Sequence, residues 1–111
     1  MKTKQGDIFL ADLNPTKGHE QSGYRPVLIM QNDILNKNLT TVLIAPITSN
    51  LNAKGKLTTA FLPKKISKLE HDSVVLLFQM RTLDKLRLRK KLTTLSEQEF
   101  VVVKEQLKFI F

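Results

Sequence analysis

Residues 41–48 read Thr-Val-Leu-Ile-Ala-Pro-Ile-Thr, a stretch rich in β-branched and aliphatic side chains that is typical of a buried strand. Pro46 lies near its end, and a proline has no backbone N–H to donate to a neighbouring strand. We therefore expect a strand over residues 41–48 whose end at Pro46 is a sheet edge or a bulge. Because the apolar stretches on both sides are also short, the sequence favours a β fold.

Other strands are expected from short apolar runs bounded by turn residues. The runs cover residues 6–13, 25–31, 58–62 and 73–79, and in residues 86–90 leucine alternates with basic residues. Such alternation indicates that one face is buried and the other lies in water. The expected connections are a loop over 14–24, a turn or one helical turn over 32–38, an exposed mobile loop over 49–57, a polar segment over 64–72 and a turn over 81–85.

The last fifteen residues carry the signals of a helix. Ser96 and Glu99 have the spacing of a capping box, and Leu95 and Phe100 that of a hydrophobic staple. The apolar residues at helical spacing are Phe100, Val103, Leu107 and Ile110. Several short strands followed by one helix predict an α+β, mainly β domain over residues 1–111, a small antiparallel β-barrel capped by a C-terminal helix.

The composition narrows the possible functions. Eighteen Lys and Arg against ten Asp and Glu give a net charge of +8, which suits a polyanionic partner; the alternative is a solvated lysine-rich surface. The basic face of residues 87–91 could track a nucleic-acid backbone or keep an edge strand soluble. The absence of cysteine excludes disulfides and thiolate chemistry, and two distant histidines make a poor zinc set, so we expect no metal or cofactor. Without a long apolar run or an apolar start, we expect a cytoplasmic protein with no membrane contact.

The segment from Gly18 to Arg25 is rich in reactive side chains. Metal-free RNA cleavage needs a base for the 2′-hydroxyl, a donor for the leaving oxygen and a cation for the phosphorane. His19 or Glu20 could accept a proton, and Arg25 could bind the phosphate. The alternatives are an exposed histidine, a glutamate that orients Arg25, and an arginine paired with a carboxylate at a rim.

Polar side chains also follow two of the expected strands. Thr48 and Ser49 form a hydroxyl pair where the strand over residues 41–48 ends, with a cap or turn as the alternative role. Gln79, Arg81 and Thr82 combine amide, guanidinium and hydroxyl donors that suit base edges or phosphate.

Four motifs occur together in this order. They are Gly6-Asp7-Ile8; Pro15-Thr16-x-Gly18-His19-Glu20-Gln21-x-Gly23-x-Arg25-Pro26-Val27-Leu28; Ala45-Pro46-Ile47-Thr48-Ser49; and Asp72-Ser73-Val74-Val75-x-x-x-Gln79-x-Arg81-Thr82-Leu83-Asp84-Lys85. Over nearly the whole chain, this set resembles the MazF/PemK (Kid) toxins of type II toxin-antitoxin modules.

The resemblance implies a homodimer with an SH3-like, plasmid-toxin barrel. It also implies a metal-independent, sequence-selective endoribonuclease, or mRNA interferase, that cuts single-stranded mRNA to a 2′,3′-cyclic phosphate and a 5′-hydroxyl and arrests growth. The catalytic candidates are Arg25, Thr48 and His19, the last of which matches a proposed acid or base of the Kid branch. The RNA-contacting candidates are Glu20, Gln21, Ser49, Phe78, Gln79, Arg81 and Thr82.

The chain departs from the family pattern at two positions. Phe78 stands where relatives commonly carry an acidic residue, and Leu76 where the Kid branch carries an arginine, so a mechanism that uses that Arg and Asp cannot operate here. Phe78 could stack on a base, lie in the core or alter sequence choice.

The resemblance also implies a MazE-like antitoxin with an acidic, partly disordered segment, and promoter DNA bound mainly through that antitoxin. Two alternatives remain open: a non-catalytic barrel that binds nucleic acid or antitoxin, and a gyrase-inhibiting toxin.

Overall fold

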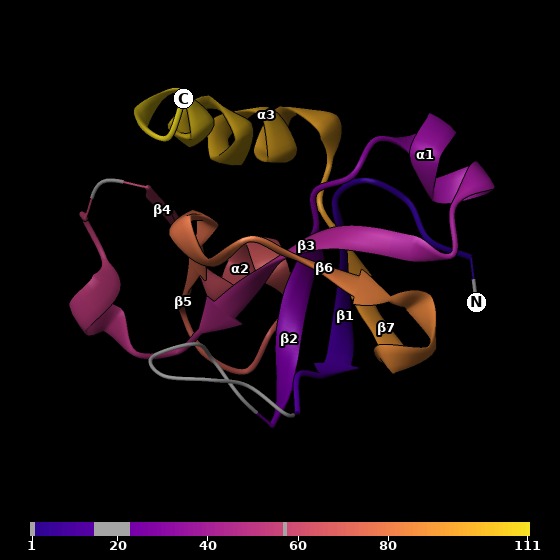
Figure 1. Cartoon of the computed structure of the whole chain (residues 1–111). Coiled ribbons are helices and arrows are strands. Elements are labelled where there is room, and N and C mark those ends of the chain that lie inside the picture. Colours follow the sequence, from indigo (N-terminus) through magenta and orange to yellow (C-terminus); the bar gives the residue numbers. More distant parts are fainter. Residues whose placement is uncertain (1, 15–22, 57) are drawn as a thin grey trace.

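Strand β3 (Thr41–Thr48) lies at the centre of the fold in the computed structural model, which describes residues 2–14, 23–56 and 58–111. The described residues form a seven-stranded antiparallel sheet (Figure 1). The other strands are β1 (Asp7–Asp12), β2 (Tyr24–Ile29), β4 (Thr59–Leu62), β5 (Ser73–Leu76), β6 (Arg81–Asp84) and β7 (Leu88–Thr94).

The strand order is β4-β5-β3-β2-β1-β7, with β6 paired to the first half of β3. At the last position β1 pairs with β7, and there the Thr94 hydroxyl donates to the buried Asp7 carboxylate at 2.7 Å. The predicted antiparallel β fold with a C-terminal helix is therefore confirmed. The sheet is open rather than a closed barrel, because the described strands at its two ends, β4 and β7, do not pair with each other.

Pro46 lies inside the sheet and not at its outer edge, although β3 is paired on only one side at this position. It is buried opposite Val27 of β2. On the other side of β3, the pairing with β6 ends at Ile44 and the pairing with β5 begins at Ile47. The proline thus occupies a position where the ladder on that side is already interrupted, which its missing N–H requires.

Both faces of the sheet are buried, in two clusters of apolar side chains. Along β1, Ile8 belongs to one cluster and Phe9 and Ala11 to the other, because successive strand side chains point to opposite faces. The first cluster includes Ile8, Leu28, Ala45, Ile47, Val75, Leu95, Phe100 and Val103, and the second includes Phe9, Ala11, Leu13, Val27, Ile29, Val42, Ile44, Leu83 and Leu88. Strand ends held in this way are a rigid base for polar side chains.

The predicted C-terminal helix is confirmed as α3 (Glu97–Glu105), which continues into the 3-10 turn η4 (Gln106–Phe109). The capping box is formed, with Ser96 Oγ accepting from the Glu99 amide at 3.1 Å and Glu99 Oε1 from the Ser96 amide at 2.8 Å. Phe100 and Val103 pack into the first cluster, so α3 covers one face of the sheet (Figure 1). No helix in the described part of the chain has the length and apolar composition needed to cross a membrane.

Several connections differ from the sequence expectation. The expected helical turn is α1 (Asp33–Asn38), but the segment expected to be merely polar contains a second short helix, α2 (Lys64–Ser67). β5 ends before the 3-10 turn η2 (Leu77–Gln79), and the expected turn that follows is strand β6. Pairing with β3 stabilises β6 over a stretch whose local signals favour a turn. The remaining 3-10 turns are η1 (Leu51–Ala53) and η3 (Lys85–Arg87).

Candidate active site

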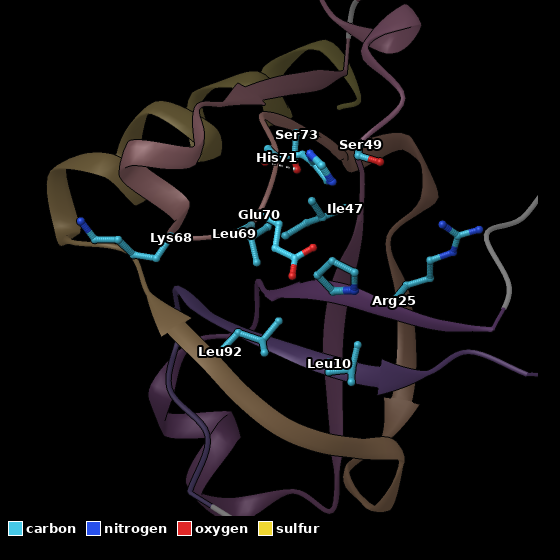
Figure 2. A pocket seen from close by; sticks show the side chains of 11 residues that line it. Leu10, Arg25, Ile47, Ser49, Lys68, Leu69, Glu70, His71, Ser73 and Leu92 are labelled. Atoms are coloured by element: carbon cyan, nitrogen blue, oxygen red, sulfur yellow. Dashed lines mark hydrogen bonds between the residues drawn. The ribbon is translucent and has the colours of Figure 1, made fainter.

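A hollow of about 450 Å³ opens where β2 begins and β3 ends (Figure 2). Leu10, Pro26 and Leu92 contribute apolar surface to it. Leu10 of β1 lies opposite Pro26 of β2, so the two share one face of the sheet. The charged and polar lining residues are Arg25, Ser49, Lys68, Glu70, His71 and Ser73. An apolar surface with a few polar groups around it is the usual form of a ligand site.

Arg25 lines this hollow from the start of β2. It is paired with Ala11 of β1, and its exposed side chain extends along the hollow in Figure 2. A guanidinium stays protonated and presents donors in a planar fork that matches phosphate oxygens. The pairing of β2 with β1 therefore fixes a permanent positive charge at the rim.

Thr48 and Ser49 come from the end of β3. Ser49 lines the hollow with Arg25, whereas Thr48 is buried, with 8% of its surface exposed. Thr48 Oγ1 accepts a hydrogen bond from the Asn50 amide at 3.1 Å, which is the turn role considered as its alternative. This contact uses a lone pair of the hydroxyl and leaves its proton to donate, but Thr48 is not among the described residues that line the hollow with Arg25.

The opposite wall of the hollow comes from the segment between α2 and β5, which the sequence analysis did not single out. Thr48 lies opposite Val74 in the β3–β5 pairing, and this register brings the residues before β5 next to those after β3. Glu70 and His71 consequently line the hollow with Ser49. A second hollow of about 420 Å³ is lined by Ser49, Leu51, Lys64, Glu70, His71 and Asp72, so the depression continues beyond Ser49.

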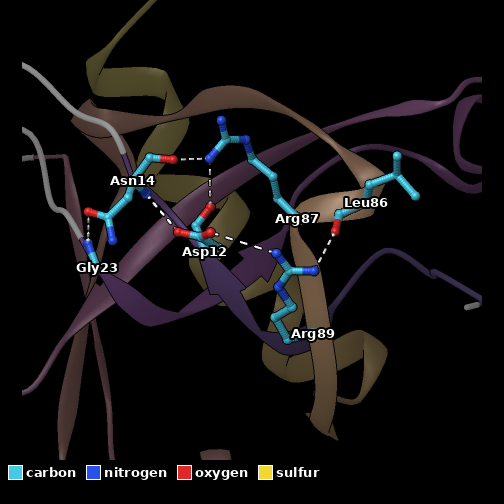
Figure 3. Close-up of polar contacts among 6 residues, drawn as sticks. All are labelled: Asp12, Asn14, Gly23, Leu86, Arg87 and Arg89. Carbon is cyan, nitrogen blue, oxygen red and sulfur yellow. Dashed lines mark hydrogen bonds and ion pairs between the residues drawn. The ribbon is translucent and has the colours of Figure 1, made fainter.

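The described residues on either side of residues 15–22 are tied to one another, and we call Asp12, Leu13, Asn14 and Gly23 the stem (Figure 3). The Leu13 amide donates to the Gly23 carbonyl at 2.9 Å, and the Gly23 amide donates to Asn14 Oδ1 at 2.9 Å. Gly23 has φ +78°, a left-handed conformation that glycine adopts without strain. The stem holds the start of β2, and with it Arg25, in place.

Arg87, at the end of η3, and Arg89 of β7 contact this stem (Figure 3). Arg87 Nη1 donates to the carbonyl oxygens of Asp12, at 3.3 Å, and of Asn14. Arg89 Nη2 lies 3.7 Å from Asp12 Oδ2. For the basic face of residues 87–91 we considered two roles, binding along a nucleic-acid backbone and keeping an edge strand soluble. The contacts of Arg87 and Arg89 with Asp12 and Asn14 belong to neither role.

The structure does not bring all predicted residues to this hollow. Gln79 lies in η2, and Arg81 and Thr82 lie in β6, which pairs with the first half of β3. Phe78 exposes 56% of its surface, so the interpretation of Phe78 as a core residue is wrong. These four residues are not among the described residues that line the hollow with Arg25.

His19, Glu20 and Gln21 lie outside the described residues. Within residues 2–14, 23–56 and 58–111, no three His, Cys, Asp or Glu side chains come together in a way that could hold a metal ion.

Comparisons with known proteins agree with the fold. Residues 4–111 match the family described as PemK-like, MazF-like toxin of type II toxin-antitoxin system. The protein named Endoribonuclease MazF from Staphylococcus epidermidis is 50% identical over 104 residues, which cover 94% of this chain and 87% of that protein. The crystal structure of MazF (form I) from Deinococcus radiodurans has a TM-score of 0.81 at 26% identity, covering 99% of this chain and 96% of that one. The MazE-MazF complex (form II) from the same organism has a TM-score of 0.76 at 26% identity, with the same coverage.

Proposed function

This chain belongs to the PemK-like, MazF-like toxin family of type II toxin-antitoxin systems, and from this premise we infer that it is an endoribonuclease toxin. One observation supports an active site at the first hollow: Arg25 of β2 and Ser49, which directly follows β3, line it together. We propose that the hollow binds single-stranded RNA, with mRNA as the cellular substrate, and that cleavage arrests growth.

The proposed reaction uses the 2′-hydroxyl of the substrate as the nucleophile. The 2′-oxygen attacks the adjacent phosphorus, the bond to the 5′-oxygen breaks, and the products are a 2′,3′-cyclic phosphate and a 5′-hydroxyl. Arg25 stabilises the negative charge that develops on the phosphorane oxygens, and Thr48 donates its hydroxyl proton to a phosphate oxygen or orients the 2′-hydroxyl. Because the nucleophile is the 2′-hydroxyl, the reaction selects RNA over DNA and needs no metal ion.

Proton transfer needs a different group from Arg25. Since a guanidinium stays protonated, Arg25 is a poor base, and its role is electrostatic. We propose His19 as the residue that supports proton transfer, on the strength of its place in the sequence motif.

RNA is longer than one hollow, so we propose that it also contacts Glu20, Gln21, Gln79, Arg81 and Thr82. Phe78 supports this path, because an exposed aromatic ring can stack on a base, and such stacking contributes about 1–3 kcal/mol per base.

We propose three assemblies for the toxin in the cytoplasm. A MazE-like antitoxin with an acidic segment covers the basic part of the RNA-binding surface around Arg25, as suggested by the Deinococcus complex and the net charge of +8. The complex binds promoter DNA through the antitoxin. The toxin itself forms a homodimer, for which the exposed apolar residues Val102, Phe109 and Phe111 at the C-terminal end provide a surface. Light scattering of the purified protein measures this oligomeric state.

The test of the function is cleavage of a long, defined single-stranded RNA in EDTA. Mapping both ends of each product should show 2′,3′-cyclic phosphates and 5′-hydroxyls at a short recognition sequence. Arg25→Ala protein purified in parallel controls for contaminating ribonuclease, and Lys37→Ala, which removes an exposed charge from α1, controls for net charge. Cleavage only with magnesium would contradict the mechanism. Binding without cleavage would indicate a binding module, and inhibition of supercoiling without cleavage a gyrase toxin.

A further inference from the structure

The segment between α2 and β5 is fixed at both ends by its own polar contacts. Near α2, the buried Ser67 accepts a hydrogen bond on Oγ from the Leu69 amide at 3.1 Å. Near β5, Asp72 Oδ1 accepts from the Lys64 amide at 2.9 Å, which ties the end of the segment to the start of α2. Leu69 also packs against the first apolar cluster. The backbone that carries Glu70 and His71 is therefore anchored before a ligand arrives.

The side chains of Glu70 and His71 are exposed from this anchored backbone. The His71 carbonyl accepts from Ser73 Oγ at 2.9 Å, but among the described residues no hydrogen bond or ion pair engages the Glu70 carboxylate or the His71 imidazole. Together with Ser49, both side chains line the two adjoining hollows. In Figure 2 the Glu70 carboxylate points into the first hollow, and His71 lies toward Ser49. The Glu70 and His71 side chains are therefore available to bind a ligand and are not used to stabilise the fold.

A carboxylate in a site that binds RNA does not bind the phosphate groups, because two negative charges repel each other. It accepts hydrogen bonds, and in single-stranded RNA the base edges carry the N–H donors that can supply them. Uracil offers only its ring N3–H as a donor on this edge, whereas adenine, cytosine and guanine each present an exocyclic amino group with two N–H donors. The neighbouring side chains of Ser49 and His71 can donate as well as accept, and the apolar surface of Leu10 and Leu92 can contact the face of a base.

We propose that Glu70, assisted by His71 and Ser49, forms a nucleobase subsite that selects a base with an exocyclic amino group beside the scissile phosphate. This specificity role rests on the proposed ribonuclease function. The same observations disfavour an acidic antitoxin segment as the ligand of this wall, since Glu70 would repel it.

The test compares wild-type protein with Glu70→Gln on an RNA library randomised around a cleavable position. Wild type should discriminate against uracil at one position by about tenfold or more, as a good side-chain contact to a base edge does. Glu70→Gln offers an N–H to the O4 of uracil, so the preference at that position alone should fall to within about twofold. Glu97→Gln, which neutralises an exposed carboxylate on α3, is the matched control and should keep the wild-type profile.

A second measurement separates this inference from the proposed chemistry. Binding of 2′-O-methyl oligonucleotides, which lack the nucleophile, reports base preference whether or not the protein cuts RNA. If wild type does not cut but Glu70→Gln alters base preference in binding, the subsite stands and the proposed function falls. Unchanged preference in both assays overturns the subsite, as does a uniform loss of rate at every sequence. An altered response only to inhibition by an acidic antitoxin peptide would assign the wall to a protein partner and also overturn it.

Discussion

Basic side chains at the start of β2 differ in their contacts from those in and before β7. Arg25 lines the hollow between β2 and the end of β3. Arg87 and Arg89 contact Asp12 and Asn14, and at the other end of β1 Lys91 Nζ lies 3.4 Å from the buried carboxylate of Asp7. The count of eighteen Lys and Arg therefore overstates the number of cations that can meet a polyanion, because some of them serve the fold.

The largest expected effect comes from the hollow. Arg25→Ala should lower the rate of RNA cleavage by about 10²–10³-fold, the usual cost of removing a group that stabilises a charged transition state. The melting temperature should stay within about 2 °C, since exposed side chains contribute little to stability. Single-turnover rates and thermal unfolding measure both quantities. A large fall in melting temperature would show that Arg25 stabilises the fold, as we expect of Arg87, and the two arginines would then not differ in role.

Arg87→Ala should produce the largest loss of stability in this comparison. It removes two charge-assisted hydrogen bonds from a half-buried side chain, so the free energy of unfolding should fall by about 2 kcal/mol. Urea unfolding measures this loss, and Arg87→Lys should restore part of it. The cleavage rate of the folded protein should fall far less than in Arg25→Ala. Unchanged stability together with lost cleavage would show that Arg87 acts on the substrate.

Gly23→Ala tests the stem itself and should cost about 1 kcal/mol, because a side chain is strained at φ +78° although no atom of the described residues beyond its chain neighbours lies within 4 Å of the added Cβ. Gly55→Ala is a close control, with φ +81° and equally open surroundings in a different loop. Both variants should lose similar stability in urea, but only Gly23→Ala should also slow cleavage. Equal effects on cleavage would mean that the stem does not position Arg25.

Arg89→Ala should have the smallest effect. Its ion pair with Asp12 is 3.7 Å long and half of the Arg89 side chain is exposed, so the free energy of unfolding should change by about 0.5 kcal/mol or less. Urea unfolding at low and high salt should give nearly the same difference between variant and wild type. A loss comparable to that of Arg87→Ala would show that both arginines hold the stem equally.

The elements that could be predicted from the sequence are those with a strong pattern in their own residues. The β-branched run of β3 and the Ser96–Glu99 capping box each specify their element within a few residues. β6 and the position of Pro46 could not be predicted in this way, because both depend on which strands pair with β3. Likewise, the contact of Arg87 with Asn14 joins residues 73 positions apart, and no local pattern reveals it.

The sequence points to residues on one wall of the hollow and not to those on the other. Arg25 begins one expected strand and Ser49 follows another, and both belong to the quoted motifs. Glu70 and His71 come from a polar segment with no signal of its own, and only the opposition of Thr48 and Val74 brings them to the hollow. The pairing of β3 with β5 is the information that places Glu70 and His71 beside Ser49.

The pairing of β1 with β7 has a consequence for the order in which the protein is made. A ribosome releases the chain from its N-terminus, so β1 and Arg25 emerge long before Thr94, whose hydroxyl meets Asp7 across 87 positions. Arg87 and Arg89, which contact the stem, also belong to the last part of the chain. Because the residues that secure the stem belong to the last part of the chain, the stem is completed only when translation is nearly finished, and Arg25 is not held in its final position before then.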